Sequence, residues 1–178
     1  MITCHNLYVD GSWDLKTDEG GWSVIQLDED ENGNLTIPFL SCGRGRGHSM
    51  TNNQMELFAA LQAGKYAKNS DGLYHIYCDS RYTVCSINDW IPRWITNHWK
   101  KTGTNKQVKN LGLMKKLHKI FHDDFFNADI QKIEAHSNKL GNELADRLAK
   151  GDFKSFISLV NKNNIIIDEE QIPYRSLT

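Results

Sequence analysis

The sequence predicts an α/β protein built on a five-stranded mixed sheet, with three antiparallel strands followed by two parallel strands and helices on both faces. Short runs of alternating apolar and polar residues occur within the first 41 positions, as half-buried antiparallel strands require. From residue 51 onward, helical patterns alternate with two short apolar runs, which is typical of strand–helix–strand units. A chain of 178 residues, with 39% hydrophobic and 24% charged residues, suits one compact domain.

The first three strands are expected at residues 5–10, 22–27 and 35–41. In the first, Leu7 and Val9 alternate with polar neighbours. An acidic turn that ends in Asn-Gly-Asn separates the second and third strands, which favours an antiparallel hairpin. A helix is expected to begin at residues 51–56, where Thr and Asn are good N-caps and Gln54 or Glu56 can complete a capping box. Its apolar stripe continues to about residue 68.

The second half of the pattern adds two strands and three helical regions. Residues 73–78 form a short apolar run that predicts a buried strand. A helix is expected over residues 80–90, and Pro92 should break or restart it. An amphipathic helix follows over residues 108–121, a weak strand over residues 130–135 and a helix over residues 140–150, which Gly151 ends.

The last 27 residues, 152–178, are interpreted as a C-terminal extension of a domain that occupies residues 1–151. Phe153, Phe156, Ile157 and Val160 have the spacing of one helix face, so a short helix is expected there. Three consecutive isoleucines at positions 165–167 would promote aggregation if they were exposed. We therefore expect the extension to pack back on the domain as a helix followed by an extended tail.

Composition and charge exclude several classes of protein. No apolar run approaches the roughly 18 residues of a membrane-spanning helix, and the N-terminus lacks the basic and apolar regions of a signal peptide. A cytoplasmic monomer without membrane contact is expected. The cysteines contain no C-x-x-C pair, so buried reduced thiols are favoured over zinc binding. A net charge of −1 means that any attraction to phosphate must come from local basic patches.

Four acidic residues occupy positions suited to metal binding. Asp10 is expected to end the first strand, and Asp79 directly follows the buried fourth strand, its parallel neighbour. Glu56 lies in the first turn of a helix and Asp146 lies in the last helix. Hard divalent cations prefer oxygen ligands, and two ions about 3.5–4 Å apart can activate a water and stabilise the leaving oxygen of a phosphodiester. Each acid alone also has an ordinary interpretation, as a turn or helix-dipole residue, so the local motifs decide.

Four local motifs surround these acids. They are Y-V-D-G-S at residues 8–12, T-N-N-Q-M-E-L at residues 51–57, Y-C-D-S at residues 77–80, and His136 followed by G-N-E-L-A-D at residues 141–146. In order and interval, over about residues 6–149, they resemble the type 1 ribonuclease H family. The second motif is similar to that family's T-N-N-x-M-E-L helix start and is highly specific.

The resemblance implies a ribonuclease H-like fold with residues 1–151 as the catalytic domain. It implies an endonuclease that cuts the RNA strand of RNA–DNA hybrids, leaves 5′-phosphate ends and uses two Mg²⁺ ions, for which Mn²⁺ can substitute. By resemblance, Asp10 bridges both ions, whereas Glu56 and Asp79 hold the ion nearer the leaving group. Asp146 would hold the ion that activates water. His136, in a polar loop, would assist catalysis or product release.

Residues near these acids are candidates for substrate binding. Asn52 and Asn53 lie at a helix N-terminus, where free N–H groups favour phosphate or sugar oxygens. The family's matching asparagines contact the hybrid. Asn142 precedes Asp146 by one helical turn and either orients it or caps the helix. Arg81 stands where the family often has Gln, which leaves a minor-groove contact there open.

Two basic segments could contact the nucleic-acid backbone. Residues 90–101 mix aromatic and basic residues and, with Lys106 and Lys109, resemble the family's basic protrusion, which grips the DNA strand. Trp99, Lys100 and Lys101 are its candidate contacts. Extra residues before Trp99 depart from the family and leave open whether Trp90 or Trp94 packs inside. Residues 43–47, which alternate Gly and Arg, form either a phosphate-binding loop or a solvated one.

Two other functions remain as alternatives. One is a DNA-directed nuclease or integrase of the same fold, against which the T-N-N-Q-M-E-L motif and the basic segment argue. The other is a non-catalytic hybrid-binding module, against which the complete acidic set argues, because loss of a ligand would be its simplest sign.

Overall fold

A six-stranded mixed sheet forms the centre of the computed structural model, which describes residues 4–47, 50–123, 126–134 and 139–167. The strand order is β5-β4-β1-β2-β3-β6. Strands β1, β2 and β3 are antiparallel neighbours, whereas β4 and β5 run parallel to β1, and β6 runs parallel to β3. The strands are β1 (Cys4–Asp14), β2 (Glu19–Glu29), β3 (Leu35–Arg46), β4 (Leu73–Cys78), β5 (Ala128–Lys132) and β6 (Ile166–Ile167).

The predicted arrangement of three antiparallel and two parallel strands is confirmed, and the expected strand number of five is wrong by one. The additional strand, β6, consists of two isoleucines that pair with Thr36 and Ile37 of β3. A run this short has no readable alternation, so the sequence predicted a covered apolar tail but no strand.

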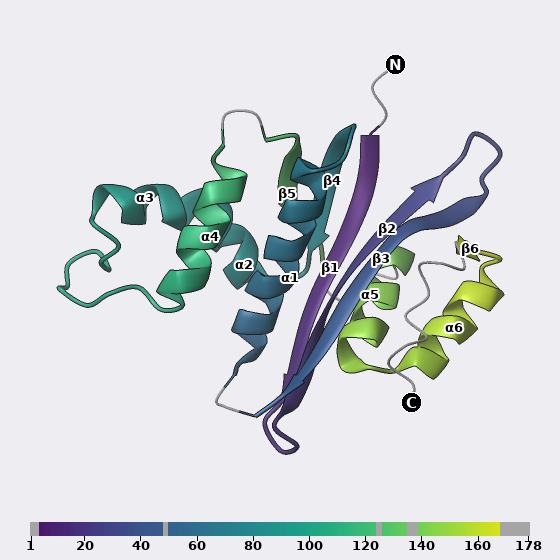
Figure 1. Cartoon of the computed structure of the whole chain (residues 1–178), viewed down its shortest axis with the longest axis horizontal. Coiled ribbons are helices and arrows are strands. Elements are labelled where there is room, and N and C mark those ends of the chain that lie inside the picture. The colour runs from purple at the N-terminus through teal and green to yellow at the C-terminus, as the bar shows by residue number, and fades with distance from the viewer. Residues whose placement is uncertain (1–3, 48–49, 124–125, 135–138, 168–178) are drawn as a thin grey trace.

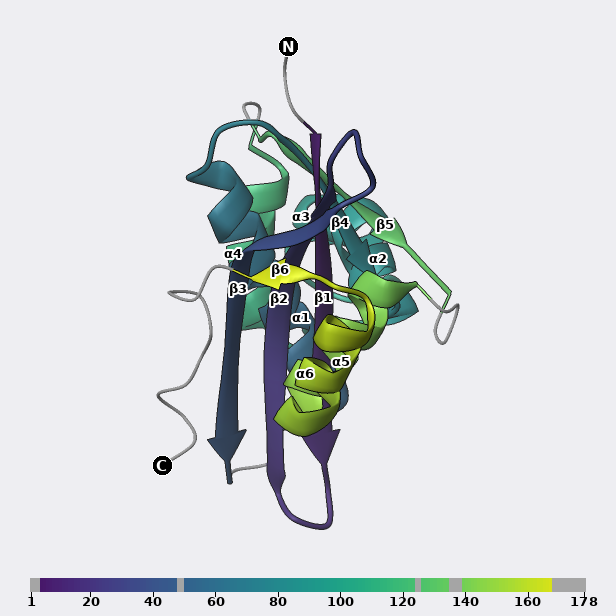
Figure 2. The same cartoon turned by 90° about the vertical axis from the view of Figure 1, so that its right-hand side faces the viewer.

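Helices cover both faces of the sheet, as predicted (Figure 1). On one face α1 packs against β1 and β2, and α4 packs on α1. On the other face α5 lies over β1 and β2, with α6 beside it (Figure 2). None of the helices in the described ranges combines the length and apolar character needed to cross a membrane. The helices are α1 (Asn52–Lys68), α2 (Arg81–Cys85), the π-helical turn η1 (Ser86–Trp90), α3 (Ile91–Thr96), α4 (Leu111–Phe121), α5 (Leu140–Lys150) and α6 (Phe153–Lys162).

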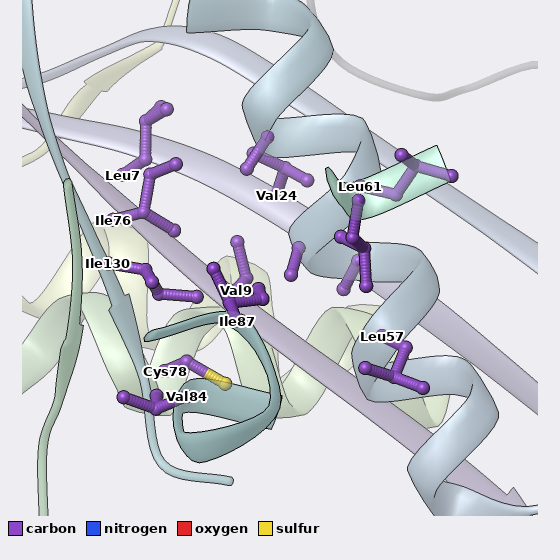
Figure 3. Packing of buried hydrophobic residues seen from close by; sticks show 14 of the residues in the cluster. Leu7, Val9, Val24, Leu57, Leu61, Ile76, Cys78, Val84, Ile87 and Ile130 are labelled. Carbon is purple, nitrogen blue, oxygen red and sulfur yellow. The ribbon is translucent and has the colours of Figure 1, made fainter. Parts of the chain in front are cut away.

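The larger hydrophobic core lies between the sheet and α1. Leu7, Ile76 and Ile130 are register partners on β1, β4 and β5 and form a row across the sheet (Figure 3). Leu57 and Leu61 of α1 are also fully buried in this cluster. The alternation of apolar residues in β1 therefore directs one set of side chains into this core and leaves Tyr8 and Asp10 on the face toward α5.

A second core joins the other sheet face to α5 and α6. Ile25 and Ile37 of the sheet pack with Leu144 and Leu148 of α5, and Phe156 of α6 is 1% exposed. The part of the C-terminal extension that the structure describes, through residue 167, thus packs on the sheet and extends it through β6. Residues 168–178 lie outside the described part of the chain.

The segment interpreted as a Gly/Arg loop at residues 43–47 is instead mostly strand. Strand β3 continues to Arg46, with Arg44 opposite Gly21 and Arg46 opposite Glu19 on β2. The loop prediction was wrong because glycines normally mark turns. Here Gly43 is a close-contact glycine, since a Cβ on it would lie 2.7 Å from the indole Nε1 of Trp22.

The remaining boundaries differ by a few residues. Pro92 restarts the helix, as one of the predicted outcomes, because it lies in the first turn of α3 after the π-helical turn. Helix α4 begins at Leu111 instead of residue 108, since the Val108 N–H donates to the Trp99 carbonyl at 3.0 Å and closes a loop. The weak strand lies at Ala128–Lys132, earlier than predicted.

The cysteine prediction is only partly correct. All four thiols are free, but Cys78 alone is buried, Cys42 and Cys85 are partly exposed, and Cys4 is exposed.

Candidate active site

Asp10 and Asp79 come together because β4 stops while β1 continues. The last β1–β4 pair is Val9 with Cys78, so Asp79 is the first residue beyond β4 and Asp10 the next residue on β1. The expectation that Asp10 ends its strand is wrong, because β1 runs on to Asp14 paired with β2, and Asp10 lies opposite Ser23. Asp10 nevertheless lies where the parallel pairing ends, which is a common ligand position in α/β sheets.

Gly11 allows the N-terminal end of α1 to reach β1. Glu56 was expected in the first turn of this helix, but it is the fifth residue, because α1 begins at Asn52 after the N-cap Thr51. A Cβ at Gly11 would lie 2.2 Å from the backbone nitrogen of Glu56, a distance that no side chain tolerates. Two further contacts fix this end of α1: the Trp13 N–H donates to Asn52 Oδ1 at 2.5 Å, and the Gln54 N–H donates to the N-cap Thr51 hydroxyl at 3.2 Å. The Asp-Gly pair of the first motif thus brings Glu56 beside Asp10.

Helix α5 brings the fourth carboxylate, Asp146, to the same place. A Cβ at Gly141 would lie 2.3 Å from the Tyr8 ring, so this glycine lets α5 approach β1 closely. The Ser23 hydroxyl donates to the Ala145 carbonyl at 2.7 Å and anchors α5 on β2, directly before Asp146 in the chain.

Polar side chains hold three of the four carboxylates. The Ser80 hydroxyl donates to Glu56 Oε2, and the Asn142 amide donates to Asp79 Oδ2 at 3.3 Å. Asp146 Oδ1 lies 2.5 Å from the ammonium of Lys150, one turn further along α5. Asn142 therefore orients Asp79 and not Asp146, which differs from the orienting role expected for it.

The electrostatic environment of Asp10 is unfavourable for its charged form. Asp10 is 8% exposed, and burial raises the pKa of its carboxyl well above the ordinary value. The negative charges of Asp79, Asp146 and Glu56 raise this pKa further, and a 2.7 Å hydrogen bond from the Gly11 N–H opposes the shift. Burial also raises the pKa of Glu56, opposed by Ser80. The cluster therefore has an excess of negative charge around a buried carboxylate.

These residues fit a hard divalent cation in their chemistry. The donors are carboxylate oxygens from β1, the residue after β4 and two helices. Among the described residues, the Oδ1 atom of buried Asn142 has no hydrogen-bond partner. Within the described ranges, no three His, Cys, Asp or Glu side chains are already disposed as ligands of one ion. A cation would thus have to draw the carboxylates inward, and it would relieve the repulsion that raises the pKa of Asp10.

The other predicted site residues are distributed between this cluster and more distant surfaces. Asn52 and Asn53 are exposed in the first turn of α1, and Arg81 is the exposed first residue of α2, directly after Ser80. His136 lies outside the described residues. Sequence reasoning missed Ser80 as a partner of Glu56 and Lys150 as a partner of Asp146. The i,i+4 spacing of Asp146 and Lys150 on one helix could have indicated the second pair.

Trp99, Lys100 and Lys101 lie apart from the carboxylates, in a projection that follows α3 and extends away from the sheet (Figure 1). Its base closes through the bridge between Lys100 and Gln107 and the Lys101 N–H donating to the Lys106 carbonyl at 2.9 Å. Lys101 is exposed, and Lys100 Nζ lies 2.8 Å from Asn105 Oδ1.

The tryptophans of η1, α3 and the projection share the packing where the projection joins the domain. Trp94 and Trp99 pack, partly buried, against the larger core, whereas Trp90 lies between Tyr82 and Trp94. The inner packing role left open between Trp90 and Trp94 therefore falls to Trp94, together with Trp99.

The fold and this site define an α/β protein with an acidic cluster at the point where the parallel pairing of two strands ends. The RNase H family model matches residues 3–154, and the chain belongs to the ribonuclease H family, whose members are endoribonucleases. It is 35% identical over 144 residues to the Ribonuclease H of Wolbachia pipientis wMel, covering 81% of this chain and 91% of that protein. It is 37% identical over 145 residues to the Ribonuclease H of Ehrlichia ruminantium, covering 81% and 90%.

Solved structures share the fold. The solution structure of the PFV RNase H domain matches with a TM-score of 0.64 at 22% identity, covering 82% of this chain and 91% of that domain. LC9-RNase H1, described as a type 1 RNase H with the type 2 active-site motif, matches with a TM-score of 0.63 at 20% identity. The match covers 92% of this chain and 74% of that chain. The foamy viral protease-reverse transcriptase in complex with RNA/DNA hybrid matches with a TM-score of 0.65 at 22% identity. The match covers 82% of this chain and 19% of that chain.

Proposed function

We propose that this chain is an endonuclease that hydrolyses the RNA strand of RNA–DNA hybrids by two-metal-ion catalysis. The observation that carries the proposal is the cluster of four carboxylates, delivered by β1, the end of β4, α1 and α5, around buried Asp10. Membership of the ribonuclease H family, with relatives named Ribonuclease H, supports the same chemistry. The cleaved RNA is expected to carry 5′-phosphate and 3′-hydroxyl ends.

Asp10, Glu56, Asp79 and Asp146 would hold two Mg²⁺ ions, with Mn²⁺ able to replace them. When bound, such a pair of ions activates a water and stabilises the leaving oxygen of a phosphodiester. Within the chain, Ser80 orients Glu56 and Asn142 orients Asp79 through their hydrogen bonds. Hydrogen bonds of this kind fix the direction of a metal-binding carboxylate.

The positions of the remaining predicted residues support roles in handling the substrate. Asn52 and Asn53 are exposed in the first turn of α1, beside Glu56, where N–H groups favour phosphate or sugar oxygens. Exposed Arg81 would contact the substrate next to Ser80. His136 would move a proton or assist product release, as its resemblance to the family's loop histidine implies.

A cleavage assay on matched RNA–DNA, RNA–RNA and DNA–DNA duplexes tests this proposal. Cleavage of the RNA strand of the hybrid alone, present with Mg²⁺ and absent with excess EDTA, is the expected result. Equal cutting of the DNA–DNA duplex would favour a DNA-directed nuclease or integrase. Hybrid binding without cleavage in Mg²⁺ or Mn²⁺ would favour a non-catalytic binding module.

A monomer is proposed because one chain contributes all four carboxylates. Sedimentation equilibrium at several protein concentrations tests this, and a mass of twice the chain would contradict it. A cytoplasmic location stays a prediction from the sequence.

A further inference from the structure

A pocket of about 330 Å³ lies next to the carboxylate cluster, between α5 and the hairpin that joins β1 to β2. Ser12 follows Asp10 by two residues, so both side chains leave β1 on the same sheet face. On the opposite wall, Lys150 lies 2.5 Å from Asp146. The pocket thus adjoins the candidate active site through Ser12 and Lys150. Its lining is Ser12, Asp14, Thr17, Glu19, Gly20, Arg44, Ala149 and Lys150.

Arg44 reaches this pocket because of the strand alternation in β3. Gly43 and Gly45 alternate with Arg44, and Gly43 packs against Trp22, which also packs with Phe58 of α1. Arg44 therefore leaves the opposite face of β3, toward α5. A Cβ on Gly151 would lie 2.0 Å from Arg44 Nη1, so the glycine that ends α5 also makes room for the guanidinium.

The charges around the pocket leave Arg44 available to an anion. The two acids in the lining have other partners: the Arg46 guanidinium donates to Glu19 Oε1, with Nε at 2.8 Å, and the Lys16 N–H donates to Asp14 at 2.8 Å. Arg44 Nη2 lies 4.0 Å from Glu19 Oε2, at the outer limit of an ion pair, and the Arg44 side chain is 39% exposed. As far as the described residues go, an arginine held this loosely has donors of its planar guanidinium to offer to phosphate oxygens.

We propose that Arg44, together with the Ser12 and Thr17 hydroxyls, binds a backbone phosphate of the RNA strand close to the phosphate that is cut. This inference rests on the proposed function. Two strand residues span roughly 7 Å, so Ser12 lies one short step from Asp10 along β1. A nucleic-acid strand whose phosphate lies at Asp10 would therefore place a neighbouring phosphate of the same strand over this pocket.

The test is a salt titration of hybrid binding by protein that carries Asp10→Asn, so that no cleavage occurs. Adding Arg44→Ala should weaken binding about tenfold, the effect of a lost charged hydrogen bond. It should also lower the slope of log K against log salt by about 0.9, since one phosphate contact is removed. Arg44→Lys, which keeps the charge, should retain most of the slope. The control is Lys162→Ala at the end of α6, an exposed cation outside the pocket lining.

Uncharged linkages identify the strand. A methylphosphonate, carried on a single deoxynucleotide for stability, is moved along each strand of a hybrid with a defined cleavage site. When the methylphosphonate occupies one position of the RNA-containing strand, adjacent to the cleavage site, Arg44→Ala and its parent should bind the hybrid with the same affinity. Coupling at a position on the DNA strand would overturn the assignment.

Failure of this inference and failure of the proposed function are distinguishable. The wild-type chain could cleave the hybrid in Mg²⁺ while Arg44→Ala and Lys162→Ala show the same hybrid affinity and the same salt slope. In that case the pocket inference fails and the proposed function stands. Absence of hybrid cleavage by the wild-type chain contradicts the proposed function itself. Urea unfolding of Arg44→Ala, whose side chain packs beside Gly151, checks that the fold is intact.

Discussion

At the scale of single residues, the four carboxylates are not equivalent. Asp10 combines near-complete burial with the charges of three neighbours, whereas Asp146 already has a cationic partner in Lys150. A charged carboxylate in Asp10's position costs folding free energy, because burial and the neighbouring carboxylates outweigh the Gly11 N–H hydrogen bond. Such a cost is typical of residues that are retained for function.

Asp10→Asn should therefore nearly abolish cleavage and leave the fold intact. The amide keeps the shape of the side chain and removes the charge that two cations would share. Removing a residue that only hydrogen-bonds to a metal ligand typically lowers activity roughly 10–100-fold. The loss of a ligand itself should therefore lower turnover by more than about 100-fold. Single-turnover cleavage of a hybrid in Mg²⁺ measures it, with circular dichroism as the control for folding. Near-normal turnover would remove Asp10 from the metal-binding set.

The raised pKa of Asp10 also predicts how stability depends on pH in EDTA. Because the folded pKa lies above the ordinary value of 3.8, folding is favoured while the carboxyl is protonated, and this stability is lost as pH rises through the folded pKa. Asp10→Asn avoids this loss. The variant should unfold at higher urea than wild type at neutral pH, and the gap should shrink toward pH 3.8. If the difference in urea unfolding between the variant and wild type were the same at every pH, the pKa of Asp10 would not be raised in the folded state.

At the scale of secondary-structure elements, a glycine sets the contact between β1 and α1. Gly11→Ala should push α1 away, because its Cβ would lie 2.2 Å from the Glu56 nitrogen. We expect a loss of about 1–3 kcal/mol in the free energy of unfolding, as for other overpacked sites. Cleavage should fall on the order of 100-fold, since a 1 Å misplacement of a catalytic group has that effect.

The matched control is Gly112→Ala in the first turn of α4, where a Cβ would meet nothing within 4 Å. This change should leave cleavage unaltered and raise stability by up to about 1 kcal/mol, because Ala is the better helix former. Urea unfolding and hybrid cleavage of both variants decide the matter. Equal behaviour of the two alanines would show that the close approach at Gly11 is unimportant.

Helix α6 is predicted to be an integral part of the domain. Phe156 is 1% exposed between α5 and the sheet, so Phe156→Ala should lower the free energy of unfolding by about 3–5 kcal/mol. Lys154 is exposed on the same helix, so Lys154→Ala should change the free energy of unfolding by no more than about 0.5 kcal/mol. Chemical denaturation measures both. A small effect of Phe156→Ala would mean that the extension is a dispensable addition.

The sequence predicted secondary-structure elements best where the segment was long and its ends carried clear helix-start or helix-stop residues. Helix α1 has Thr51 as its N-cap, and α5 has an apolar stripe and ends at Gly151. The limits of both helices agree with the prediction to within about a residue. The end of β3 was missed because glycines that alternate with arginines look like a turn, and only the contact of Gly43 with Trp22 explains their place in a strand. The shift of β5 and the late start of α4 likewise depend on pairing partners far away in sequence.

For the candidate site, local motifs predicted which acids would meet, because each motif also builds the contact that positions its acid. Gly11 follows Asp10, and Gly141 precedes Asp146 on the helix that packs on Tyr8. The partners of the acids were less accessible to prediction. Ser80 reads simply as a helix cap, and whether Asn142 serves Asp79 or Asp146 depends on how α5 packs on the sheet.

At the scale of the whole molecule, a net charge of −1 cannot attract a polyanion, so binding must depend on where cations gather. The projection beyond α3 carries Lys100, Lys101, Lys106 and Lys109 within ten positions, well separated in the fold from α5 and α6 (Figure 1). If these lysines contact phosphates, they supply binding without taking part in the chemical step.

Replacing Lys100 and Lys101 together with Ala tests this separation. Two lost phosphate contacts should reduce the slope of log K against log salt by about 1.8, and hybrid affinity should fall while single-turnover cleavage at saturating protein stays nearly unchanged. Most of the effect is expected from Lys101, because the ammonium of Lys100 is partly satisfied by Asn105 at 2.8 Å. The matched control is the double change of Lys154 and Lys162 on α6, across the sheet, which removes the same charge. If both double variants lose affinity and slope equally, the effect is one of net charge alone, and the projection has no specific part in binding.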